Sequence, residues 1–209
     1  MNIALINASP KATGSASKVL LEDLAGLINE DDTVKDFAIN KPSIAEHEVG
    51  ELCKCDAWVF AFPLYVDGIP SHLLSCLCRM EQMSISNRQI YVYAIVNCGF
   101  YEGKQCHNAL AIMENWCDKT GFIWGMGIGY GGGGALASMG NIPLGRGPKR
   151  SLGQAYRILA NAILTDTQTE NYYTSVSLPE FLYRQAAEYS WKQMIKANGG
   201  RYADLNKKI

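Results

Sequence analysis

The chain has 209 residues, of which 48% are hydrophobic and 19% are charged, so it can form a folded core and is too weakly charged for a disordered protein. Its apolar runs, such as residues 58–62, are far shorter than the roughly 20 residues that a membrane-spanning helix needs. The N-terminus has no secretory signal pattern, and the cysteine count of 7 is odd, which disfavours a disulfide framework. We expect a soluble, cytoplasmic protein that has no membrane partner.

The charge is unevenly distributed along the chain. Residues 1–118 carry 15 acidic and 8 basic side chains, whereas residues 119–209 carry 5 acidic and 11 basic ones. The cations Arg146, Lys149 and Arg150 fall in a stretch without carboxylates, which indicates either a solvated face or a field that favours an anionic ligand. Because the basic residues form no dense run and no nucleic-acid motif is present, we expect no nucleic-acid partner.

Strand-like apolar runs alternate with helical patterns along the chain. The runs are Ile3–Asn7, Thr33–Ile39, Ala57–Phe62, Ile90–Asn97 and Phe122–Gly129, of which Thr33–Ile39 is weaker and fits a sheet edge. The other four are nearly continuous, as is typical of parallel strands that are buried on both faces. The alternation predicts an α/β fold, a doubly wound sheet of five parallel strands in the order 2-1-3-4-5 with helices on both faces.

The helices of this sheet leave apolar stripes in the sequence. One stripe (Leu20, Leu24, Leu27, Ile28) follows the cap region Ser15–Ser17, and another runs from Cys106 to Cys117 and ends at the predicted C-cap Gly121. A helical pattern continues to Leu164, polar loop-like sequence follows to Ser177, and a last helix begins near Pro179. We expect a single domain over residues 1–209, with a core over 1–165 and a helical extension over 166–209.

In an open parallel sheet, ligands bind outside the carboxyl ends of the strands, so the loops that follow the strands are the candidate site. The first loop, residues 8–17, combines four hydroxyl side chains with a glycine and a helix start, which suits a phosphate group. An ordinary serine-rich N-cap is the alternative, since a cap needs one hydroxyl. The pattern of a nucleotide-triphosphate P-loop is absent from the sequence.

Two further loops place apolar and aromatic residues at strand ends. Residues 62–70 read FPLYVDGIP and residues 97–103 read NCGFYEG. Exposed apolar side chains in residues 62–70 would be covered by a flat aromatic ligand or a partner subunit, unless that loop folds back onto the core. Residues 97–103 pair small residues with two aromatics, which lets backbone N–H groups approach the edge of a ring; a plain turn with a hydrophobic staple is the alternative.

The fourth loop belongs to a glycine-rich segment that holds 12 of the 20 glycines between Gly121 and Gly153. The pattern G-x-G-x-x-G occurs at Gly127, Gly129 and Gly132. We do not interpret it as a dinucleotide fingerprint, because no amphipathic helix follows at once and no acidic residue lies about 20 positions on. A loop with nearby cations that is either flexible or closely packed is the interpretation that we favour.

Together, the motifs INASP-x-x-x-GSAS, FPLYVDGIP and NCGFYEG resemble the flavodoxin-like NAD(P)H-dependent FMN reductases and quinone reductases. The resemblance covers residues 1–165 in order and spacing, and it implies a flavodoxin-like fold. It also implies bound FMN as cofactor, with NAD(P)H as co-substrate. The residues that it assigns to cofactor binding are Ser9, Lys11, Ser15, Ala16, Ser17, Pro63, Leu64, Tyr65, Val66, Asn97, Cys98, Gly99, Phe100 and Glu102.

Within that resemblance, residues 9–17 hold the FMN phosphate, residues 63–66 line the flavin ring and residues 97–102 close its other edge. The implied reaction passes hydride from NAD(P)H through FMN to a small acceptor, such as a flavin or a quinone, in a ping-pong cycle. Backbone N–H groups of residues 64–66 and 99–100 would stabilise negative charge on the ring. Tyr65 is the candidate for stacking on the nicotinamide or the flavin, and no catalytic side chain or metal is assigned.

Other functions fit the sequence less well. A flavodoxin that only carries single electrons is the main alternative, although such carriers are strongly acidic and this chain has a net charge of −1. Cys53-x-Cys55 and Cys76-x-Cys78 lack metal-site spacing, so buried structural cysteines are favoured. The resemblance also implies a homodimer or a higher homo-oligomer, with the stripe Leu73, Leu74, Leu77 and Met80 either at the subunit contact or facing the sheet.

Overall fold

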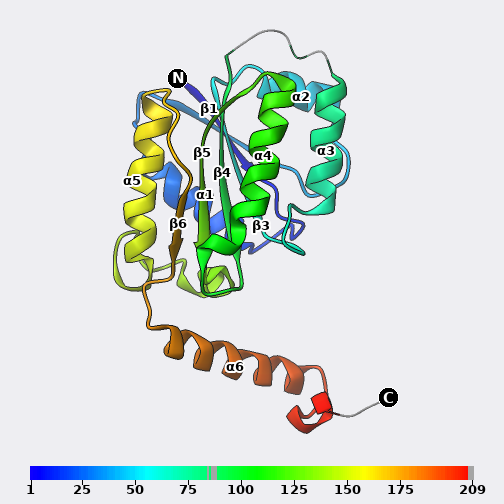
Figure 1. Cartoon of the computed structure of the whole chain (residues 1–209), viewed down its shortest axis with the longest axis vertical. Coiled ribbons are helices and arrows are strands. Elements are labelled where there is room, and N and C mark those ends of the chain that lie inside the picture. The colour runs from blue at the N-terminus through cyan, green and yellow to red at the C-terminus, as the bar shows by residue number, and fades with distance from the viewer. Residues whose placement is uncertain (84, 86–88, 207–209) are drawn as a thin grey trace. The chain divides into compact units, whose positions relative to one another are not determined.

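The computed structural model describes residues 1–83, 85 and 89–206 and forms a parallel six-stranded sheet (Figure 1). The strand order is β2-β1-β3-β4-β5-β6, and all five strand pairings are parallel. The strands are β1 (Asn2–Asn7), β2 (Thr33–Ala38), β3 (Ala57–Pro63), β4 (Tyr91–Cys98), β5 (Ile123–Gly131) and β6 (Tyr172–Ser175). The prediction of an α/β doubly wound sheet is confirmed, and so are the positions of its first five strands.

The predicted number of five strands is wrong, because β6 extends the sheet beyond β5. This strand pairs with the end of β5 in the register Ile128↔Tyr172 to Gly131↔Ser175. It has four residues, all half-buried, and it lies within the segment predicted as a polar loop. Asn171, just before the strand, accepts the Gly127 N–H at 2.7 Å through its side-chain oxygen, which helps to fix β6 against β5.

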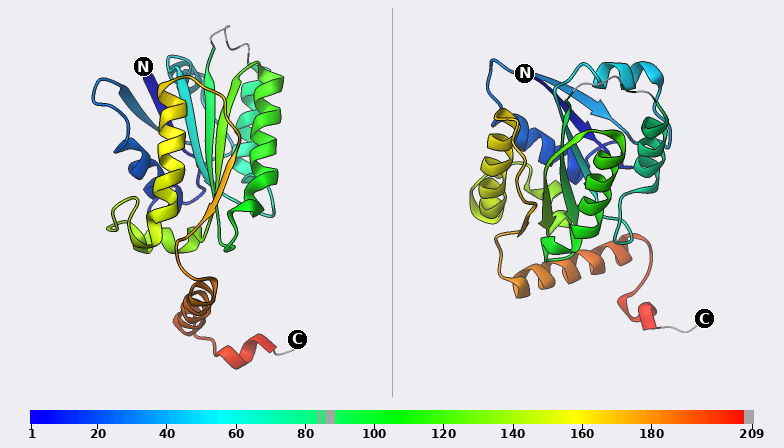
Figure 2. Two further views of the ribbon diagram at one scale, coloured as in Figure 1. Left: turned by 60° about the vertical axis from the view of Figure 1, so that its left-hand side comes forward. Right: turned by 45° about the horizontal axis from the view of Figure 1, so that its top comes forward.

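Helices cover both faces of this sheet (Figure 2). Helices α1 and α5 contact the strands on one face, and α3 and α4 pack against each other and against the core on the other. The helices are α1 (Ala16–Ala25), α2 (Glu46–Leu52), α3 (Ser71–Gln82), α4 (His107–Thr120), α5 (Arg150–Leu164) and α6 (Glu180–Ala197). Four short 3-10 turns complete the structure, namely η1 (Gly103–Cys106), η2 (Gly133–Met139), η3 (Gly147–Lys149) and η4 (Tyr202–Asn206).

The chain forms two compact units, Met1–Val176 and Ser177–Ile209. The first unit contains the whole sheet and extends past residue 165 because β6 joins the sheet. The second contains α6, which begins directly after Pro179 as predicted and buries none of its side chains. None of the helices in the described part of the chain is long and apolar enough to cross a membrane.

The helix ends follow the predicted capping residues. Ser15 is the N-cap of α1, and its hydroxyl accepts the Lys18 N–H at 3.2 Å. Gly121 ends α4 in the left-handed conformation, at φ 76°, where glycine has no Cβ to clash. Helix α1 ends at Ala25, before the predicted stripe residues Leu27 and Ile28, which lie in a turn.

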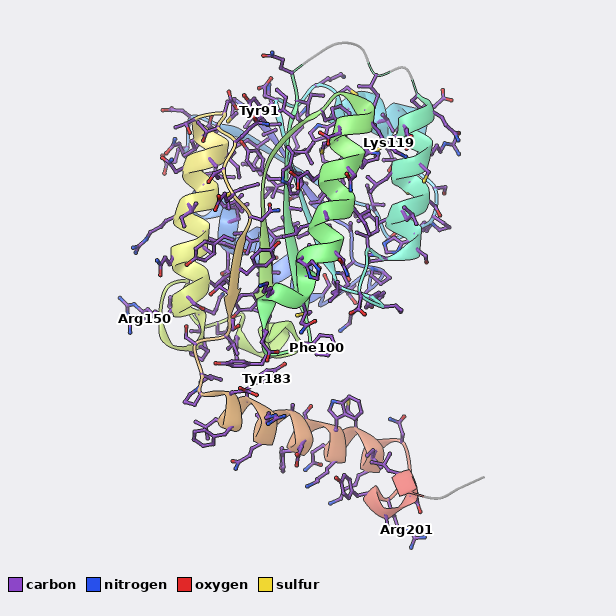
Figure 3. The ribbon with its side chains drawn as sticks, in the orientation of Figure 1. Tyr91, Phe100, Lys119, Arg150, Tyr183 and Arg201 are labelled. Atoms are coloured by element: carbon purple, nitrogen blue, oxygen red, sulfur yellow. The ribbon has the colours of Figure 1, made fainter. Side chains whose placement is uncertain are left out.

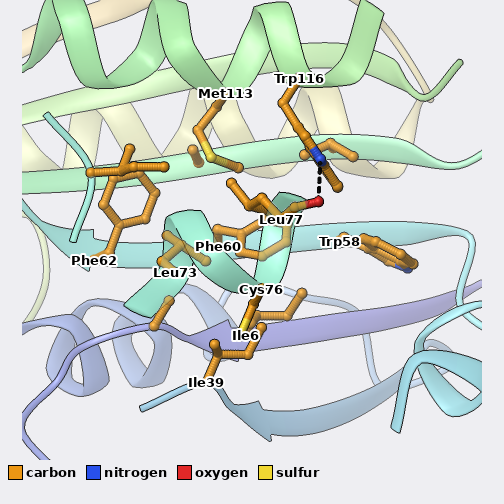
Figure 4. Packing of buried hydrophobic residues seen from close by; sticks show 14 of the residues in the cluster. Ile6, Ile39, Trp58, Phe60, Phe62, Leu73, Cys76, Leu77, Met113 and Trp116 are labelled. Atoms are coloured by element: carbon orange, nitrogen blue, oxygen red, sulfur yellow. Dashed lines mark hydrogen bonds between the residues drawn. The ribbon is translucent and has the colours of Figure 1, made fainter. Parts of the chain in front are cut away.

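The core between the sheet and helices α3 and α4 is rich in aromatic residues (Figure 4). The Trp116 indole N–H donates to the Leu77 carbonyl oxygen at 3.1 Å, and the Phe60 and Trp116 rings pack edge to face with centroids 6.2 Å apart. Leu77, like Leu73 and Met80, is buried in this core. Of the stripe proposed as a dimer contact, these three residues face the sheet and only Leu74 is exposed, whereas the homodimer itself stays a prediction.

The cysteines of α3 point in different directions, as their spacing predicts, since Cys76 is buried and Cys78 is exposed. Within the described residues, no group of three or more histidine, cysteine, aspartate or glutamate side chains could hold a metal ion.

The glycines of β5 allow close packing of the backbone. A Cβ at Gly129 would lie 2.6 Å from the carbonyl oxygen of Gly103, and one at Gly131 would lie 2.7 Å from the Gly103 nitrogen. Both contacts are closer than real Cβ atoms approach, so the turn η1 can lie against β5 only because these positions are glycines. The pattern G-x-G-x-x-G falls largely within β5. The packing is close, as one of our two alternatives held, but the prediction that these glycines lie in a loop is wrong up to Gly131.

Candidate functional site

The candidate site is the carboxyl edge of the sheet, where the structure brings the four predicted loops together. Hydrogen bonds connect the strand ends in pairs: Ala8 N–H to Ala61 O at 2.9 Å, Leu64 N–H to Asn97 O at 2.8 Å and Gly132 N–H to Phe100 O at 2.7 Å. Figure 3 shows Phe100 at this edge and Arg150 at the same end of α5, with Tyr91 and Lys119 at the opposite end.

The loop between β1 and α1 is held by its own hydroxyl groups. Ser9, Ser15 and Ser17 are buried, whereas Lys11 is exposed and Ala16 is half-buried. The Ser9 hydroxyl accepts the Lys11 N–H at 3.2 Å, and the Ser15 hydroxyl accepts from the Lys18 N–H and from the Asn7 side-chain amide, the latter at 3.4 Å. The N-cap alternative is therefore correct for Ser15, but it accounts for only one of the three serines.

These serines keep the capacity to bind an anion. Each hydroxyl accepts a hydrogen bond, and among the described residues no acceptor for the hydroxyl hydrogen of Ser9, Ser15 or Ser17 is found. The first N–H groups of α1 have no acceptor within the helix, and the helix dipole favours negative charge at this end. Lys11 adds a cation, because its ammonium group lies 3.9 Å from where a Cβ of Gly14 would stand.

The loop after β3 is a tight hairpin that presents apolar side chains to solvent. Tyr65 and Gly68 exchange two backbone hydrogen bonds, both of 3.0 Å, around Val66 and Asp67 at φ 49° and 56°. Two consecutive positive φ values are typical of a type I′ turn. Val66 is fully exposed and Tyr65 is 50% exposed, whereas Pro63 and Leu64 are half-buried.

Val66 is an unusual residue for this conformation. A β-branched side chain at positive φ is a genuine outlier, and such strained residues cluster at functional sites. The Leu64 N–H donates to the Asn97 carbonyl oxygen of β4, and the Tyr65 N–H donates to the Gly68 carbonyl oxygen within the turn. Our expectation that both N–H groups would stabilise a ligand's negative charge is therefore wrong. Within the described part of the chain, the Val66 N–H has no backbone acceptor.

The loop after β4 forms the other side of the site. Gly99, Phe100 and Glu102 are exposed, and Phe100 is 54% exposed. A Cβ at Gly99 would meet no atom within 4 Å, so this position faces open space. Tyr65, Val66 and Phe100 thus supply exposed apolar surface from two neighbouring strand ends.

Asn97, at the end of β4, connects the loops beneath this surface. Its buried side-chain amide donates to the Ser17 hydroxyl at 3.3 Å and to the Phe62 carbonyl oxygen at 3.2 Å. A Cβ at Gly133 would lie 2.7 Å from its amide oxygen, so the start of η2 covers it. The structure therefore gives Asn97 a positioning role between β3, β4 and α1.

Cys98 is buried below the same loop, beside a residue that the sequence analysis did not assign. Its thiol donates weakly to the carbonyl oxygens of Phe100 and Glu102, both 3.8 Å from the sulfur, and the Cys106 thiol donates to the Val96 carbonyl oxygen at 3.5 Å. The nearby Cys106 thiol lowers the pKa of Cys98 against the effect of burial, whereas Cys98 and burial together raise the pKa of Cys106.

Three features of this edge were missed from the sequence. Asn7 orients the first loop, because its side-chain oxygen accepts the Ser9 N–H at 3.2 Å, and its place at the end of a strand was a usable signal. Cys106 was assigned only to an apolar helix stripe. Lys149 was predicted to lie on a solvated face or in a field that favours an anionic ligand, but it is fully buried and paired with Asp23.

Comparison with known proteins supports the fold. No protein-family model matches the chain, and no curated protein matches its sequence. Solved structures do match. An NADPH-quinone reductase from P. pentosaceus is 16% identical with a TM-score of 0.55, and the match covers 77% of this chain and 98% of that chain.

Two further solved structures match the chain with similar identity and coverage. An NAD(P)H:quinone oxidoreductase from Methanothermobacter marburgensis is 14% identical with a TM-score of 0.53, over 76% of this chain and 96% of that chain. A WrbA-like flavodoxin from Agrobacterium tumefaciens is 15% identical with a TM-score of 0.51, over 78% of this chain and 98% of that chain. The topology and these matches together show that the chain has the flavodoxin-like fold.

Proposed function

We propose that this protein is an FMN-dependent oxidoreductase that uses NAD(P)H to reduce a small acceptor such as a quinone or a flavin. The observation that carries the proposal is the meeting of a serine-rich helix start with two apolar loops at the carboxyl edge of the sheet. Two matched structures of the same fold are described as quinone reductases, which supports the assignment.

The residues present fit a flavin mononucleotide. Its phosphate carries negative charge and needs several donors, and the loop from Ser9 to Ser17 offers hydroxyl hydrogens, helix N–H groups and the Lys11 ammonium. Its ring is flat and largely apolar, and the exposed side chains of Tyr65, Val66 and Phe100 offer a surface of the same kind.

Each loop then has a separate task. The first loop holds the phosphate end and fixes the position of the cofactor along the edge. Tyr65 and Phe100 exclude water from the ring, and the Val66 N–H is the candidate donor for negative charge on it. Tyr65 is half-exposed, so its ring can also orient the nicotinamide. The transfer of hydride from NAD(P)H to the small acceptor is the chemistry that FMN supplies when it is bound.

The test is an anaerobic titration of the FMN-loaded protein with NADPH and, separately, with NADH, followed by the visible absorption of the flavin. We expect rapid bleaching by one of the two nucleotides and recovery of the colour when a quinone is added. If neither nucleotide bleaches bound FMN, the protein belongs with the electron carriers. If it retains no FMN, the proposal is wrong.

A further inference from the structure

The second unit of the chain contains a long helix that buries no side chain. Helix α6 has 18 residues, none of them buried, and its side chains stand out along its whole length (Figure 3). An isolated helix of this length is only marginally stable in water, because most helical stability in proteins comes from the packing of an apolar face. The helix therefore needs a surface to pack against.

The charged residues of α6 form one stripe along the helix. They stand at every fourth position, and a helix turns once in about 3.6 residues, so they share one side: Glu180, Arg184, Glu188, Lys192 and Lys196. Two ion pairs run along this stripe, Arg184–Glu180 at 3.7 Å and Lys192–Glu188 at 4.0 Å. The opposite, uncharged face consists of Leu182, Tyr183, Ala186, Ser190 and Met194. The helix is therefore amphipathic.

Large apolar side chains of this unit are open to solvent. Trp191 is 64% exposed, whereas the other three tryptophans of the chain are buried. Tyr189 and Met194 of α6, and Tyr202 and Leu205 of η4, are also more than half exposed. A group of exposed apolar residues that is bordered by charges marks a site of interaction with a protein or a membrane.

The end of the chain has the opposite charge to the rest. Residues 189–209 carry 5 basic side chains and 1 acidic one, whereas residues 1–188 carry 14 basic and 19 acidic ones. Of these cations, Lys192 lies 4.9 Å from the centre of the Tyr202 ring, and Arg201 lies 3.8 Å from Asp204. An anionic surface attracts this segment and repels the remainder of the protein, so charge selects the part of the molecule that approaches it.

We propose that α6 and η4 bind the surface of an anionic lipid bilayer, with the uncharged face of α6 towards the lipid and the charged stripe at the headgroups. Binding of this kind increases with the apolar area that is buried and with the attraction to anionic lipids, and this segment provides both. Trp191 and Tyr189 lie on the two borders between the stripe and the uncharged face. Tryptophan and tyrosine side chains favour the headgroup level of a membrane.

The same observations favour lipid over other anionic or apolar partners. A nucleic acid would use the positive charge and leave the apolar side chains uncovered. Pairing with α6 of a second copy would bring two basic segments together, which is unfavourable. Our expectation that the protein has no membrane partner was based on the lack of a spanning segment, and a helix that lies along a lipid surface needs none.

The test is co-sedimentation of the full-length protein with lipid vesicles, made either of phosphatidylcholine alone or of phosphatidylcholine with anionic phosphatidylglycerol. We expect the protein to sediment with the anionic vesicles and to stay in solution with the neutral ones. High salt should release it, because salt screens the attraction. Acrylamide quenching of tryptophan fluorescence reports the bound surface, since Trp191 is exposed and the other tryptophans are buried. Anionic vesicles should protect Trp191 from the quencher.

Variants separate the contribution of charge from that of apolar contact. Lys192→Gln with Lys196→Gln should weaken binding to anionic vesicles about thirtyfold, because each basic side chain near such a surface contributes a factor of about five. The matched control, Lys54→Gln with Lys119→Gln, removes the same charge from exposed positions of the first unit and should leave binding unchanged. Trp191→Ala should weaken binding about tenfold through lost apolar contact. Because α6 buries no side chain, changes in it should not alter the urea unfolding of the protein.

The proposal is wrong if the protein does not sediment with anionic vesicles, or if the control pair weakens binding as much as the pair in α6. Protection of Trp191 without vesicles, together with a doubled mass in light scattering, would show that a second copy covers the segment and would overturn the proposal as well. None of these measurements involves FMN or a nicotinamide, so failure of this proposal and failure of the proposed function can be told apart.

Discussion

Replacing Lys149 with methionine should destabilise the fold without changing the choice of nicotinamide. The Lys149 ammonium lies 2.7 and 2.5 Å from the two carboxylate oxygens of Asp23, and it is fully buried, whereas the Asp23 side chain is 15% exposed. Removing one partner of a buried ion pair costs about 3–5 kcal/mol, because the other charge is left unpaired. Since Asp23 retains some contact with solvent, we expect the lower end, about 3 kcal/mol.

The assay is urea unfolding at neutral pH, with the exposed neighbour Arg150→Met as the matched control. The control should change the free energy of unfolding by less than about 0.5 kcal/mol. The double variant Asp23→Leu with Lys149→Met should recover most of the loss, because two apolar side chains of similar size leave no unpaired charge. A loss below about 1 kcal/mol for Lys149→Met alone would refute the argument.

The dependence on pH gives a second check on the same pair. Burial raises the pKa of Asp23 above its ordinary value, although the hydrogen bond and the charge of Lys149 oppose this rise. A carboxyl whose pKa is higher in the folded state contributes less to stability as the pH increases through that range. Without Lys149 the pKa of Asp23 should rise further. The loss of unfolding free energy caused by Lys149→Met should therefore be smaller at pH 5 than at pH 8.

Three other predictions concern the candidate site directly. Ser15→Ala with Ser17→Ala should weaken FMN binding by about 3 kcal/mol or more, because a hydrogen bond to a charged group contributes about 1.5–3 kcal/mol. A fluorescence titration measures the affinity, with Ser75→Ala, an exposed serine on α3 outside this loop, as control, and unchanged affinity would contradict the phosphate site. Val66→Gly should stabilise the fold by about 1 kcal/mol in urea unfolding, because glycine removes the strain of a β-branched side chain in the left-handed conformation, at φ 49°. A loss of stability would show that the turn is not strained. Asn97→Ala should cost about 2 kcal/mol through its two buried hydrogen bonds, and it should also weaken FMN binding if the alignment of Ser17 depends on it.

The sequence predicted the strands well because burial on both faces leaves nearly continuous apolar runs. Strand β6 lacks that signal. Its four residues YYTS are half-buried and lie at the edge of the sheet, so they need no apolar pattern, and their pairing depends on a long-range contact with β5. No local pattern in the sequence reports such a contact.

The environment of single side chains was harder to predict than the position of the loops. Lys149 lies between a proline and an arginine in a glycine-rich stretch, which reads as solvent-exposed, and its burial depends on Asp23, which lies on α1. The turn at Tyr65–Gly68 places Val66 and Asp67 at positive φ, where the usual sequence signal is Asn-Gly. In both cases contacts elsewhere in the fold override the local preference.

The success in predicting the position of the loops and the failure to predict the environment of single side chains have one physical origin. In a parallel sheet all strands end at the same edge, so topology alone places a motif at a strand end, and the serine-rich loop and the FPLYV segment can be located from their positions after predicted strands. Whether a side chain at that edge meets a ligand or holds its neighbours depends on which hydrogen bonds are already made. Asn97 and Cys98 were both assigned to the ligand, yet the first donates to Ser17 and Phe62 and the second donates to the carbonyl oxygens of Phe100 and Glu102. Those partners are up to 80 positions away in the chain, so only the folded structure can separate the residues that bind from those that position.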